Sequence, residues 1–515
     1  MNFESIRPHK HCTAGHAGST NGKINEMSRT TQIVASLVLA GMCGLGSTAH
    51  AQAVPADGTG IAGAYAPSKI WQPPKDPQAL EKLKKFQDLK FGFFLCWGTQ
   101  TQWETIDQSW SLCPERYDWN KRPGTHANDD TLTYKKAYEE LVRTFNPVKF
   151  DPEKIAEIAE AAGTRYLVFC TKHHDGFCFF DTATTDYKIT SNECPYHTNP
   201  NANVTRKLFD AFRRRGFWIG AYFSKPDWNV PYYWAPQFGP PIDRNPNYSP
   251  KDHPEVWTKF KDFTWSQIRE LMSQYGPVDI LWLDGGQVQP NNGQNIDMPG
   301  MARMARELQP GLLVVDRTAG GGYEDFLTPE GTHAMPDRFM PEAWEACMTL
   351  GDWWGWSKNS SYHSSGNIVR YLVKAVARNG NLLLDVGPDA NGELDPQAVK
   401  VLTEVGQWLK VNGEAIFETR PIKPYELGNV FFTAKKDGTV YAIALSSKDG
   451  DPMPASVTLP TALLASAKKV SLIGSDNAAI SFSPDKSRDI TDVQLPQAAA
   501  LKTPVTHAWA LKIEK

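Results

Sequence analysis

The 515-residue sequence carries no large excess of charge of either sign. Its formal net charge is −3, with 54 Lys and Arg residues against 57 Asp and Glu residues. Without a strongly basic field, nucleic acid is not expected as a partner. No apolar run reaches the roughly 20 residues that a membrane-spanning helix needs, so we expect no membrane insertion. Hydrophobic residues still make up 41% of the chain, enough to bury a large core.

Several catalytic signatures are also missing from the sequence. It has no GxSxG elbow, no Walker loop and no HExxH motif, which argues against esterases, nucleotide hydrolases and zincin-type proteases. The eight cysteines show no CxxC pair and no zinc-finger spacing, and the sequence assigns no disulfide pairing. Residues 58–63 match GxGxxG, but no strand precedes them, so a dinucleotide site is not indicated.

The N-terminal part of the chain predicts processing. An apolar run of about 13 residues, Ile33–Leu45, is too short to span a bilayer and is followed by Ala49-His50-Ala51, an A-x-A cleavage pattern. We expect residues 1–51 to be an N-terminal extension and signal peptide, with the signal over 27–51 and cleavage near Ala51. The mature protein is then exported, either periplasmic or secreted. Residues 52–80, rich in Pro, Gly and Ala, predict a linker.

Short apolar runs alternate with amphipathic helical patterns over residues 81–420. The runs that predict strands are Phe91–Leu95, Arg165–Cys170, Phe217–Phe223, Val278–Leu283, Leu312–Val315 and Leu382–Val386. Helical patterns that stop at glycine precede most of these runs, which is typical of a parallel sheet. Six or so such units favour an irregular (β/α)8-type barrel, with a doubly wound sheet as the alternative.

Residues 421–515 have a different texture. Two short apolar runs, Val430–Thr433 and Val440–Ala444, flank the turn signal Lys436-Asp437-Gly438. Further alternating runs follow to the end of the chain. This region predicts a small antiparallel β-sandwich.

Function in a barrel gathers where the strands end, and Asp284 closes one strand just before two glycines. A carboxylate at that place can attack as a nucleophile or accept a proton, although it could also cap a turn. His173 and His174 end another strand. They suit a metal pair, an acid–base set or hydrogen-bond donors to a ligand, and a metal hydrolase built with Asp175 is one alternative.

Glycoside hydrolysis requires two carboxylates, one of them acting as an acid. Four glutamates follow Asp284 in a loop-rich, Trp-rich stretch, and the residue pattern alone does not choose among Glu324, Glu330, Glu342 and Glu345. The chain has 17 Trp residues, which suits a site that stacks on the apolar face of a sugar.

The motifs taken together resemble the retaining α-L-fucosidases of glycoside hydrolase family 29. The residues that carry the resemblance are Phe145-Asn146-Pro147, Phe150-Asp151-Pro152, Thr171–Phe177, Leu281–Gly285, Gly380–Leu384, Gly387-Pro388, Gly406–Leu409 and Asn412–Ile416. The resemblance implies an irregular barrel followed by a β-sandwich, an oligosaccharide or glycoconjugate substrate, and neither metal nor cofactor.

The resemblance also implies residue roles. Asp284 falls on the family's nucleophile, and Glu330 falls on its acid/base, with Glu345 as the second choice. Arg317 would keep the nucleophile ionised. The residues that the resemblance places at the sugar are Cys96, Trp97, Trp110, His173, His174, Tyr222, Trp282 and Arg317.

Two positions depart from the family pattern. The first strand usually ends in His-Trp-Gly and here ends in Cys96-Trp97-Gly98, and the family's Glu-Trp becomes Ser109-Trp110. A thiol is a weaker donor than imidazole, and serine lacks charge. We therefore expect an exo-acting retaining enzyme for terminal α-L-fucosyl residues. Two alternatives are the same chemistry on a related sugar such as an α-L-galactoside, and a non-catalytic carbohydrate-binding protein. The sequence assigns no oligomeric state.

Overall fold

The computed structural model describes residues 71–117, 119–317, 319, 322–475, 479–484, 487–497 and 506–515. The predicted signal peptide and residues 52–70 of the predicted linker lie outside the described residues. Within the described part, no helix combines the length and the apolar character needed to cross a membrane.

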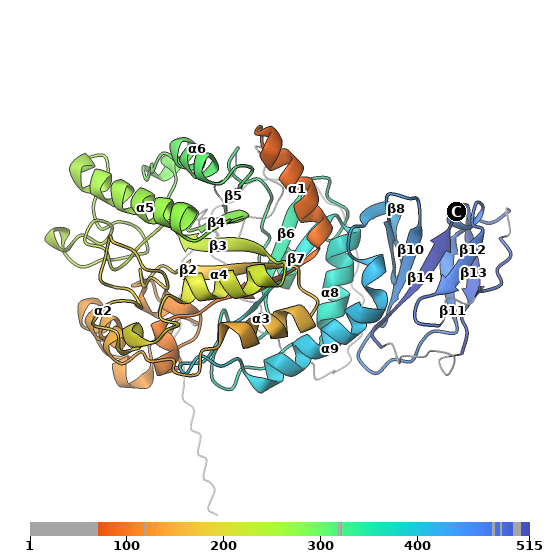
Figure 1. The fold of residues 1–515 in the computed structure, drawn as a ribbon, viewed down its shortest axis with the longest axis horizontal. Coiled ribbons are helices and arrows are strands. Elements are labelled where there is room, and N and C mark those ends of the chain that lie inside the picture. Colours follow the sequence, from red (N-terminus) through yellow and green to blue (C-terminus); the bar gives the residue numbers. More distant parts are fainter. Residues whose placement is uncertain are drawn as a thin grey trace, which may run out of the picture. The chain divides into compact units, whose positions relative to one another are not determined.

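A seven-stranded parallel sheet forms the centre of the larger domain (Figure 1). Its strands are β1 (Phe91–Leu95), β2 (Tyr166–Lys172), β3 (Trp218–Ser224), β4 (Ile280–Asp284), β5 (Leu313–Asp316), β6 (Trp344–Thr349) and β7 (Gly380–Val386). The order across the sheet is β5-β4-β3-β2-β1-β7-β6. The first and last strands in sequence, β1 and β7, are therefore neighbours, as in a barrel, and the predicted fold class is confirmed.

The gap between β5 and β6 is bridged by an extended segment, residues 324–330. Glu324 makes an antiparallel bridge to Val315 of β5, and Leu327 and Glu330 make parallel bridges to β6. The amide of Cys347 in β6 donates to the carbonyl of Pro329 at 3.0 Å. This segment takes the place of a regular eighth strand, which explains the irregularity of the ring.

Successive side chains on each strand point alternately into the ring and out of it. Inside, one buried cluster collects Phe94 and Cys96 from β1 and its end, and Ile280 and Trp282 from β4. The alternate residues, such as Leu283, belong to the outer core against the helices. Asp284 is in phase with Ile280 and Trp282, so its side chain also faces inward, at the mouth.

The helices surround the sheet and begin at well-formed caps. α3 starts at Pro152, because Pro fits the first turn and Asp151 accepts hydrogen bonds from the amides of Glu153 and Lys154. The main helices are α1 (Pro77–Leu89), α2 (Thr131–Glu139), α3 (Pro152–Ala161), α4 (Val204–Arg214), α5 (Pro254–Gln274), α6 (Met298–Leu308), α7 (Gly331–Ala334), α8 (Ser365–Ala377) and α9 (Pro396–Asn412).

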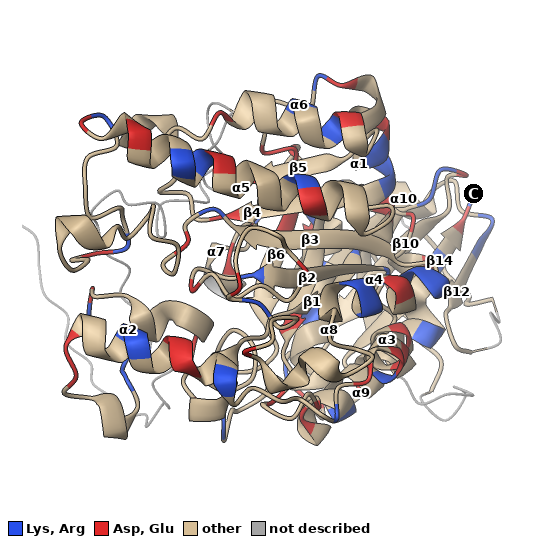
Figure 2. Cartoon of the chain, turned by 60° about the vertical axis from the view of Figure 1, so that its left-hand side comes forward, with Lys and Arg blue, Asp and Glu red and all other residues tan. Residues whose placement is uncertain are grey.

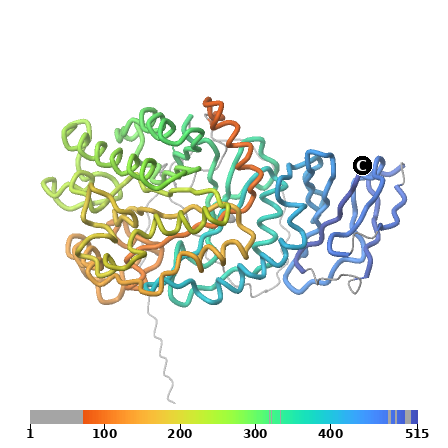
Figure 3. Tube along the Cα trace, in the orientation of Figure 1, coloured from red at the N-terminus to blue at the C-terminus, as the bar shows by residue number. Residues whose placement is uncertain are grey.

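Antiparallel sheets follow α9, and their path can be traced in Figure 3. The strands are β8 (Arg420–Leu427), β9 (Val430–Ala434), β10 (Val440–Leu445), β11 (Ser456–Pro460), β12 (Lys469–Leu472), β13 (Ile490–Gln494) and β14 (Ala508–Glu514), with the short helix α10 (Thr461–Leu464). Five of them are ordered β12-β14-β10-β9-β8, and β11 pairs with β13. The predicted C-terminal β-domain is thereby confirmed.

Strand β6 is a difference from the sequence prediction, which left Trp344–Thr349 in a loop-rich stretch. The strand carries Glu345 on its inward face between Ala343 and Cys347, so its apolar pattern is interrupted where it is most buried. A buried acid within a strand interrupts the run of apolar residues from which the strand would be predicted.

Charged side chains are interleaved on the outer helices. Figure 2 shows basic and acidic residues side by side on α4 and α5. Arg215, at the end of α4, illustrates the pattern, since it pairs with Glu160 at 2.7 Å and Glu157 at 3.1 Å. Such surface pairs give solubility and little stability.

Candidate active site

Asp284 lies at the inward-facing end of β4 and is held by three neighbours. Tyr222 donates its hydroxyl to Oδ2 at 2.7 Å, Arg317 donates Nη1 to Oδ1 at 3.0 Å, and His174 Nε2 lies 3.9 Å from Oδ2. Burial alone would raise the pKa of Asp284, but Arg317, His174 and the Tyr222 hydroxyl together hold it well below its ordinary range. The side chain keeps 16% of its surface exposed, so an ionised oxygen remains within reach of a ligand.

The residue after Asp284 shapes this end of the strand. Gly285 has φ +85°, and a Cβ placed there would lie 2.2 Å from Cδ of Pro226. Only glycine permits both the turn and this close approach. The turn stops β4 where the Asp284 carboxylate reaches the mouth of the ring.

Glu330 reaches the same place from the segment that closes the ring. Its Oε2 pairs with Nη2 of Arg317, and its Oε1 accepts the indole N–H of Trp354 at 3.1 Å. Arg317 therefore holds Asp284 on one nitrogen and Glu330 on the other. A planar guanidinium with two carboxylates on neighbouring nitrogens fixes both acids around one small volume.

Glu345, the second candidate for the acid/base, is in a different environment. It is fully buried beneath the site, accepts hydrogen bonds from Tyr166 Oη at 2.5 Å and Trp282 Nε1 at 3.1 Å, and has a pKa raised to about 7 by burial. Trp282 lies over it and stacks with Tyr222, with ring centroids 5.3 Å apart. This position favours Glu330 as the residue that can reach a leaving group.

The two histidines line the wall beside Asp284. His173 shares a 2.5 Å hydrogen bond through Nδ1 with Ser109 Oγ, and its ring stacks with that of Tyr222. Burial lowers the pKa of His173 well below its ordinary value and that of His174 to about 4, so both imidazoles are neutral near pH 7. His174 Nδ1 is buried without a hydrogen-bond partner among the described residues.

The two departures at Cys96 and Ser109 are both buried. Cys96 is 1% exposed and faces inward beside Cys170 and Asp385, and burial raises the pKa of its thiol. Ser109 is 0% exposed, and its hydroxyl is used by His173. Trp110, next along the chain, remains partly exposed and contacts the His174 ring edge-on at 5.4 Å.

Trp97 is the predicted sugar-site residue that the fold places elsewhere. Its side chain points to the outer core, where it stacks on Phe179 with ring centroids 5.1 Å apart. Its indole N–H donates to the Asp389 carbonyl at 3.0 Å. The ring is 1% exposed, and this packing gives Trp97 a structural role.

Two carboxyl groups at the mouth are not among the predicted site residues. Asp385 lies one residue before the end of β7, in phase with Leu383, is 1% exposed, accepts the amide of Gly355 at 2.7 Å and has a pKa raised to about 7 by burial. Asp107 lies in the loop after β1 and interacts electrostatically with Asp284, Glu330 and Asp385. Asp385 follows the same inward phase as Asp284, which was available from the sequence. Asp107 is part of no periodic pattern.

The two histidines and Asp284 offer atoms that could together ligate a metal ion. Atoms of His173, His174 and Asp284 lie within 4.8 Å of one another. Asp175, predicted as the third member of a metal site, instead accepts hydrogen bonds from Tyr138 at 2.9 Å and from the Phe177 amide at 3.1 Å. Arg317 already neutralises Asp284, so a cation added there would face a like charge at close range.

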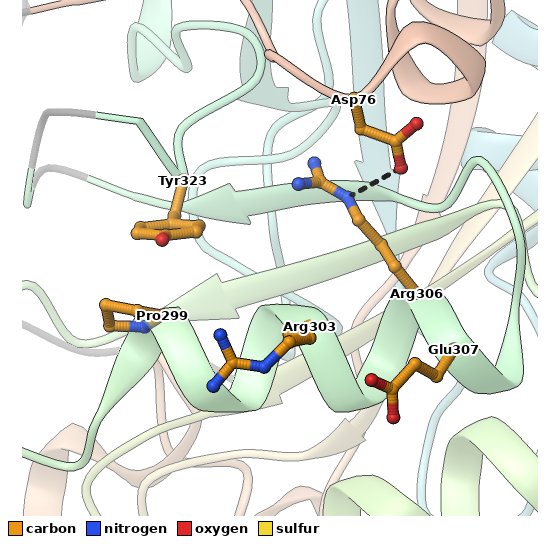
Figure 4. A pocket seen from close by; sticks show the side chains of 6 residues that line it. All are labelled: Asp76, Pro299, Arg303, Arg306, Glu307 and Tyr323. Carbon is orange, nitrogen blue, oxygen red and sulfur yellow. Dashed lines mark ion pairs between the residues drawn. The ribbon is translucent and has the colours of Figure 1, made fainter.

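A hollow of about 380 Å³ lies on the outer side of the barrel, beside α6 (Figure 4). Its lining residues are Asp76, Pro299, Arg303, Arg306, Glu307 and Tyr323. Arg306 pairs there with Asp76 at 3.9 Å and with Asp325 at 2.8 Å. None of the predicted site residues contributes to this hollow, so it is separate from the mouth of the ring.

Comparisons with known proteins identify the family of the chain. A family model described as alpha-L-fucosidase matches residues 63–414, and one described as alpha-L-fucosidase C-terminal domain matches residues 425–514. Tissue alpha-L-fucosidase of Rattus norvegicus is 27% identical over 450 residues, covering 84% of this chain and 89% of the relative. Alpha-L-fucosidase of Dictyostelium discoideum is 25% identical, covering 71% and 78%.

Solved structures show the same architecture. Alpha-L-fucosidase isoenzyme 1 from Paenibacillus thiaminolyticus has a TM-score of 0.68 and 28% identity, covering 85% of this chain and 100% of its own. An alpha-L-fucosidase GH29 from Bacteroides thetaiotaomicron shares the fold with a TM-score of 0.66 at 23% identity, covering 86% and 96%. The resemblance seen in the sequence motifs is confirmed: the chain belongs to the alpha-L-fucosidase family and is a glycoside hydrolase.

Proposed function

We propose that this enzyme releases terminal α-L-fucosyl residues from glycans with retention of configuration, using Asp284 as nucleophile and Glu330 as acid and base. The observation that carries the proposal is the shared guanidinium of Arg317, which holds both carboxylates at one point of the mouth. Retaining glycosidases have their two carboxyl groups about 5–5.5 Å apart, and a shared guanidinium keeps these two acids close together, which supports this mechanism.

In the first step, an oxygen of Asp284 attacks the anomeric carbon while the glycosidic C–O bond breaks. Glu330 gives its proton to the departing oxygen, which leaves as the aglycone hydroxyl. The low pKa of Asp284 keeps it ionised and ready to attack. Each Glu330 oxygen accepts one donor, Arg317 or Trp354, and so retains a second lone pair that can carry the proton.

In the second step, the ionised Glu330 removes a proton from water as the water oxygen bonds to the anomeric carbon. The ester bond to Asp284 breaks, the free sugar leaves, and Glu330 again carries the proton. Two inversions at one carbon give net retention. Tyr222, which donates to Asp284 Oδ2, stabilises the carboxylate when it departs.

The neutral histidines suit recognition of sugar hydroxyls. A neutral imidazole both donates and accepts, and the buried Nδ1 of His174 has no partner among the described residues. The ring stack of Tyr222 and Trp282 forms the floor beneath them. We assign His173, His174, Trp110, Tyr222 and Trp282 to the walls and floor of the sugar subsite.

The test is hydrolysis of an aryl α-L-fucoside by residues 52–515, followed by proton NMR during the first minutes. We expect turnover with α-L-fucose as the first anomer formed. The β anomer as first product would contradict retention. An aryl α-L-galactoside, assayed in parallel, tests the related sugar; faster turnover of it would replace the fucoside as preferred substrate, and binding of either sugar without turnover would favour a binding protein.

We also propose that the chain is exported after cleavage near Ala51. The supporting pattern is the short apolar run Ile33–Leu45 followed by Ala49-His50-Ala51. N-terminal sequencing of the protein recovered outside the cytoplasm should begin at Gln52. A chain that keeps residues 27–51 and stays in the cytoplasm would contradict this.

A further inference from the structure

Asp107 lies at the mouth of the ring, and its carboxyl group has no role in the proposed catalytic steps. It precedes a short 3-10 helix, Gln108–Leu112, whose residues contact the end of β2 one after another. Gln108 Oε1 lies 3.7 Å from Cys170 Sγ, Ser109 bonds His173, and the Trp110 ring meets the His174 ring. Asp107 is therefore anchored at the same rim as the two histidines.

The Asp107 side chain is partly exposed and lacks a partner. Among the described residues its carboxyl group has no hydrogen bond and no ion pair, and it does not cap the 3-10 helix that follows it. Its electrostatic neighbours are Glu330, Asp385 and Asp284, the acids of the mouth. Asp107 thus lies near these acids, and no described Lys or Arg forms an ion pair with it that would explain its presence as a structural pair.

The backbone at this point is in an uncommon conformation. Asp107 and Gln108 both have positive φ, at 56° and 51°. Left-handed backbone at residues other than glycine costs free energy, and consecutive instances persist where the surrounding structure holds them. The buried contacts of Gln108 and Ser109 hold this turn and so fix where the Asp107 carboxyl group lies.

At the two positions that depart from the family pattern, no strong polar group is left free for a sugar hydroxyl. Cys96 and Ser109 are 1% and 0% exposed, and the Ser109 hydroxyl is occupied by His173. A sugar that enters beside Asp284 therefore lacks two polar contacts on this side. Asp107 lies two residues before Ser109, and its partly exposed carboxyl group has no partner among the described residues.

We propose that Asp107 binds a hydroxyl group of the sugar ring in the subsite of Asp284 and Glu330, and so helps to determine which sugar is accepted. This rests on the proposed fucosidase function. Burial and the neighbouring acids raise the pKa of Asp107 to about 8, which leaves it mostly protonated at neutral pH. A carboxylic acid both donates and accepts, which matches a hydroxyl, and it adds no further negative charge beside the nucleophile.

The test compares variants on substrates that lack single hydroxyl groups. Asp107→Gly removes the side chain and tolerates the positive φ, and Asp107→Asn keeps a group that donates and accepts. Glu104→Gln is the matched control, because Glu104 also has positive φ but pairs with Lys358 at the surface. Each protein is assayed on an aryl α-L-fucoside and on its 2-, 3- and 4-deoxy analogues, with circular dichroism to verify folding.

We expect Asp107→Gly to lower kcat/KM on the full fucoside by about 10- to 100-fold, the usual cost of losing one buried hydrogen bond. On one deoxy analogue the same variant should match the wild type within about twofold, because the hydroxyl that Asp107 binds is already absent. Asp107→Asn should recover part of the loss, and Glu104→Gln should behave as wild type. An equal loss on all substrates, or no loss on any, would overturn the proposal.

If the wild-type enzyme hydrolyses none of the fucosides, the proposed function fails independently of Asp107. Calorimetric binding of L-fucose and L-galactose then decides the inference. Weaker binding of either sugar by Asp107→Gly than by wild type supports a contact from Asp107, and equal binding or no binding by both proteins overturns it.

Discussion

Two aspartates end neighbouring strands of the ring, and they do different things. Asp284 ends β4 in phase with the inward-facing Trp282, keeps 16% of its side chain exposed and contacts Arg317 and Tyr222. Asp316 ends β5 out of phase with the inward-facing Val315, is 7% exposed and pairs with the fully buried Lys225. One step of strand register therefore separates the proposed nucleophile from a carboxylate that pairs with a buried lysine.

The mouth of the ring carries carboxylates on both of its faces. Strand ends place carboxylates on both the inner and the outer face. On the outer face, Asp316 forms an ion pair with the buried Lys225. Lys172, at the end of β2, also pairs at 2.9 Å with a buried carboxylate, that of Asp227 in the loop after β3. These ion pairs neutralise the buried charges outside the ring, while Asp284 and the other acids of the mouth lie on its inner face.

The largest effect is expected for Asp284→Ala. We expect turnover of an aryl α-L-fucoside to fall by roughly 10³-fold or more, because the covalent route is lost. The variant should still fold, since the residue lies at the mouth, with a melting temperature lowered by loss of the pair with Arg317. Steady-state kinetics with differential scanning calorimetry checks both. A folded variant with near-normal turnover would refute the nucleophile role.

Glu330→Ala should have the next largest effect, a loss of about 10²- to 10⁴-fold, as expected for a general acid and base. Azide needs no base to attack the covalent intermediate, so added azide should restore part of the rate and yield a fucosyl azide detectable by mass spectrometry. Glu345→Gln serves as the contrast. Any loss in that variant should come with lower stability and no azide rescue; rescue in Glu345→Gln alone would reassign the acid/base.

Asp316→Ala should act on stability. It leaves the buried ammonium of Lys225 without its carboxylate, which typically costs about 3–5 kcal/mol of unfolding free energy. Urea unfolding followed by tryptophan fluorescence measures this. Asp210→Ala, which breaks an exposed pair with Arg213, is the control and should cost less than about 1 kcal/mol. Equal costs for the two variants would mean that the inner and outer aspartates do not differ as described.

Arg317→Met should shift the pH profile. Arg317 lowers the pKa of Asp284, so its removal raises that pKa, and the acidic limb of kcat/KM should move to higher pH by about 1–3 units. The same pairing stabilises the fold above the ordinary pKa of aspartate, and this contribution disappears as the pH falls through the lowered value. An unchanged acidic limb would show that Arg317 does not set the ionisation of the nucleophile.

The smallest expected effect is that of a chelator. Because Arg317 occupies Asp284 and Ser109 engages His173, EDTA should leave turnover unchanged. Loss of activity that a divalent metal restores would favour a metal site at His173, His174 and Asp284 instead.

The sequence predicted most strands and the strand-end position of Asp284, because clean apolar runs and terminal glycines are local signals. It did not predict β6, whose inward-facing Glu345 interrupts the apolar pattern. It also did not predict Asp107, since a loop residue carries no periodicity. The outward packing of Trp97 depends on which face of the sheet the residues after β1 occupy, and a sequence motif does not show this.

We propose that Asp284 forms the covalent bond to the sugar. The most direct test is to incubate the enzyme with a 2-fluoro-fucosyl fluoride, digest it and locate the added sugar mass by tandem mass spectrometry. We expect a single labelled peptide, with the 2-fluoro-fucosyl group on Asp284 and no label in Asp284→Ala. A label on any other residue would contradict it.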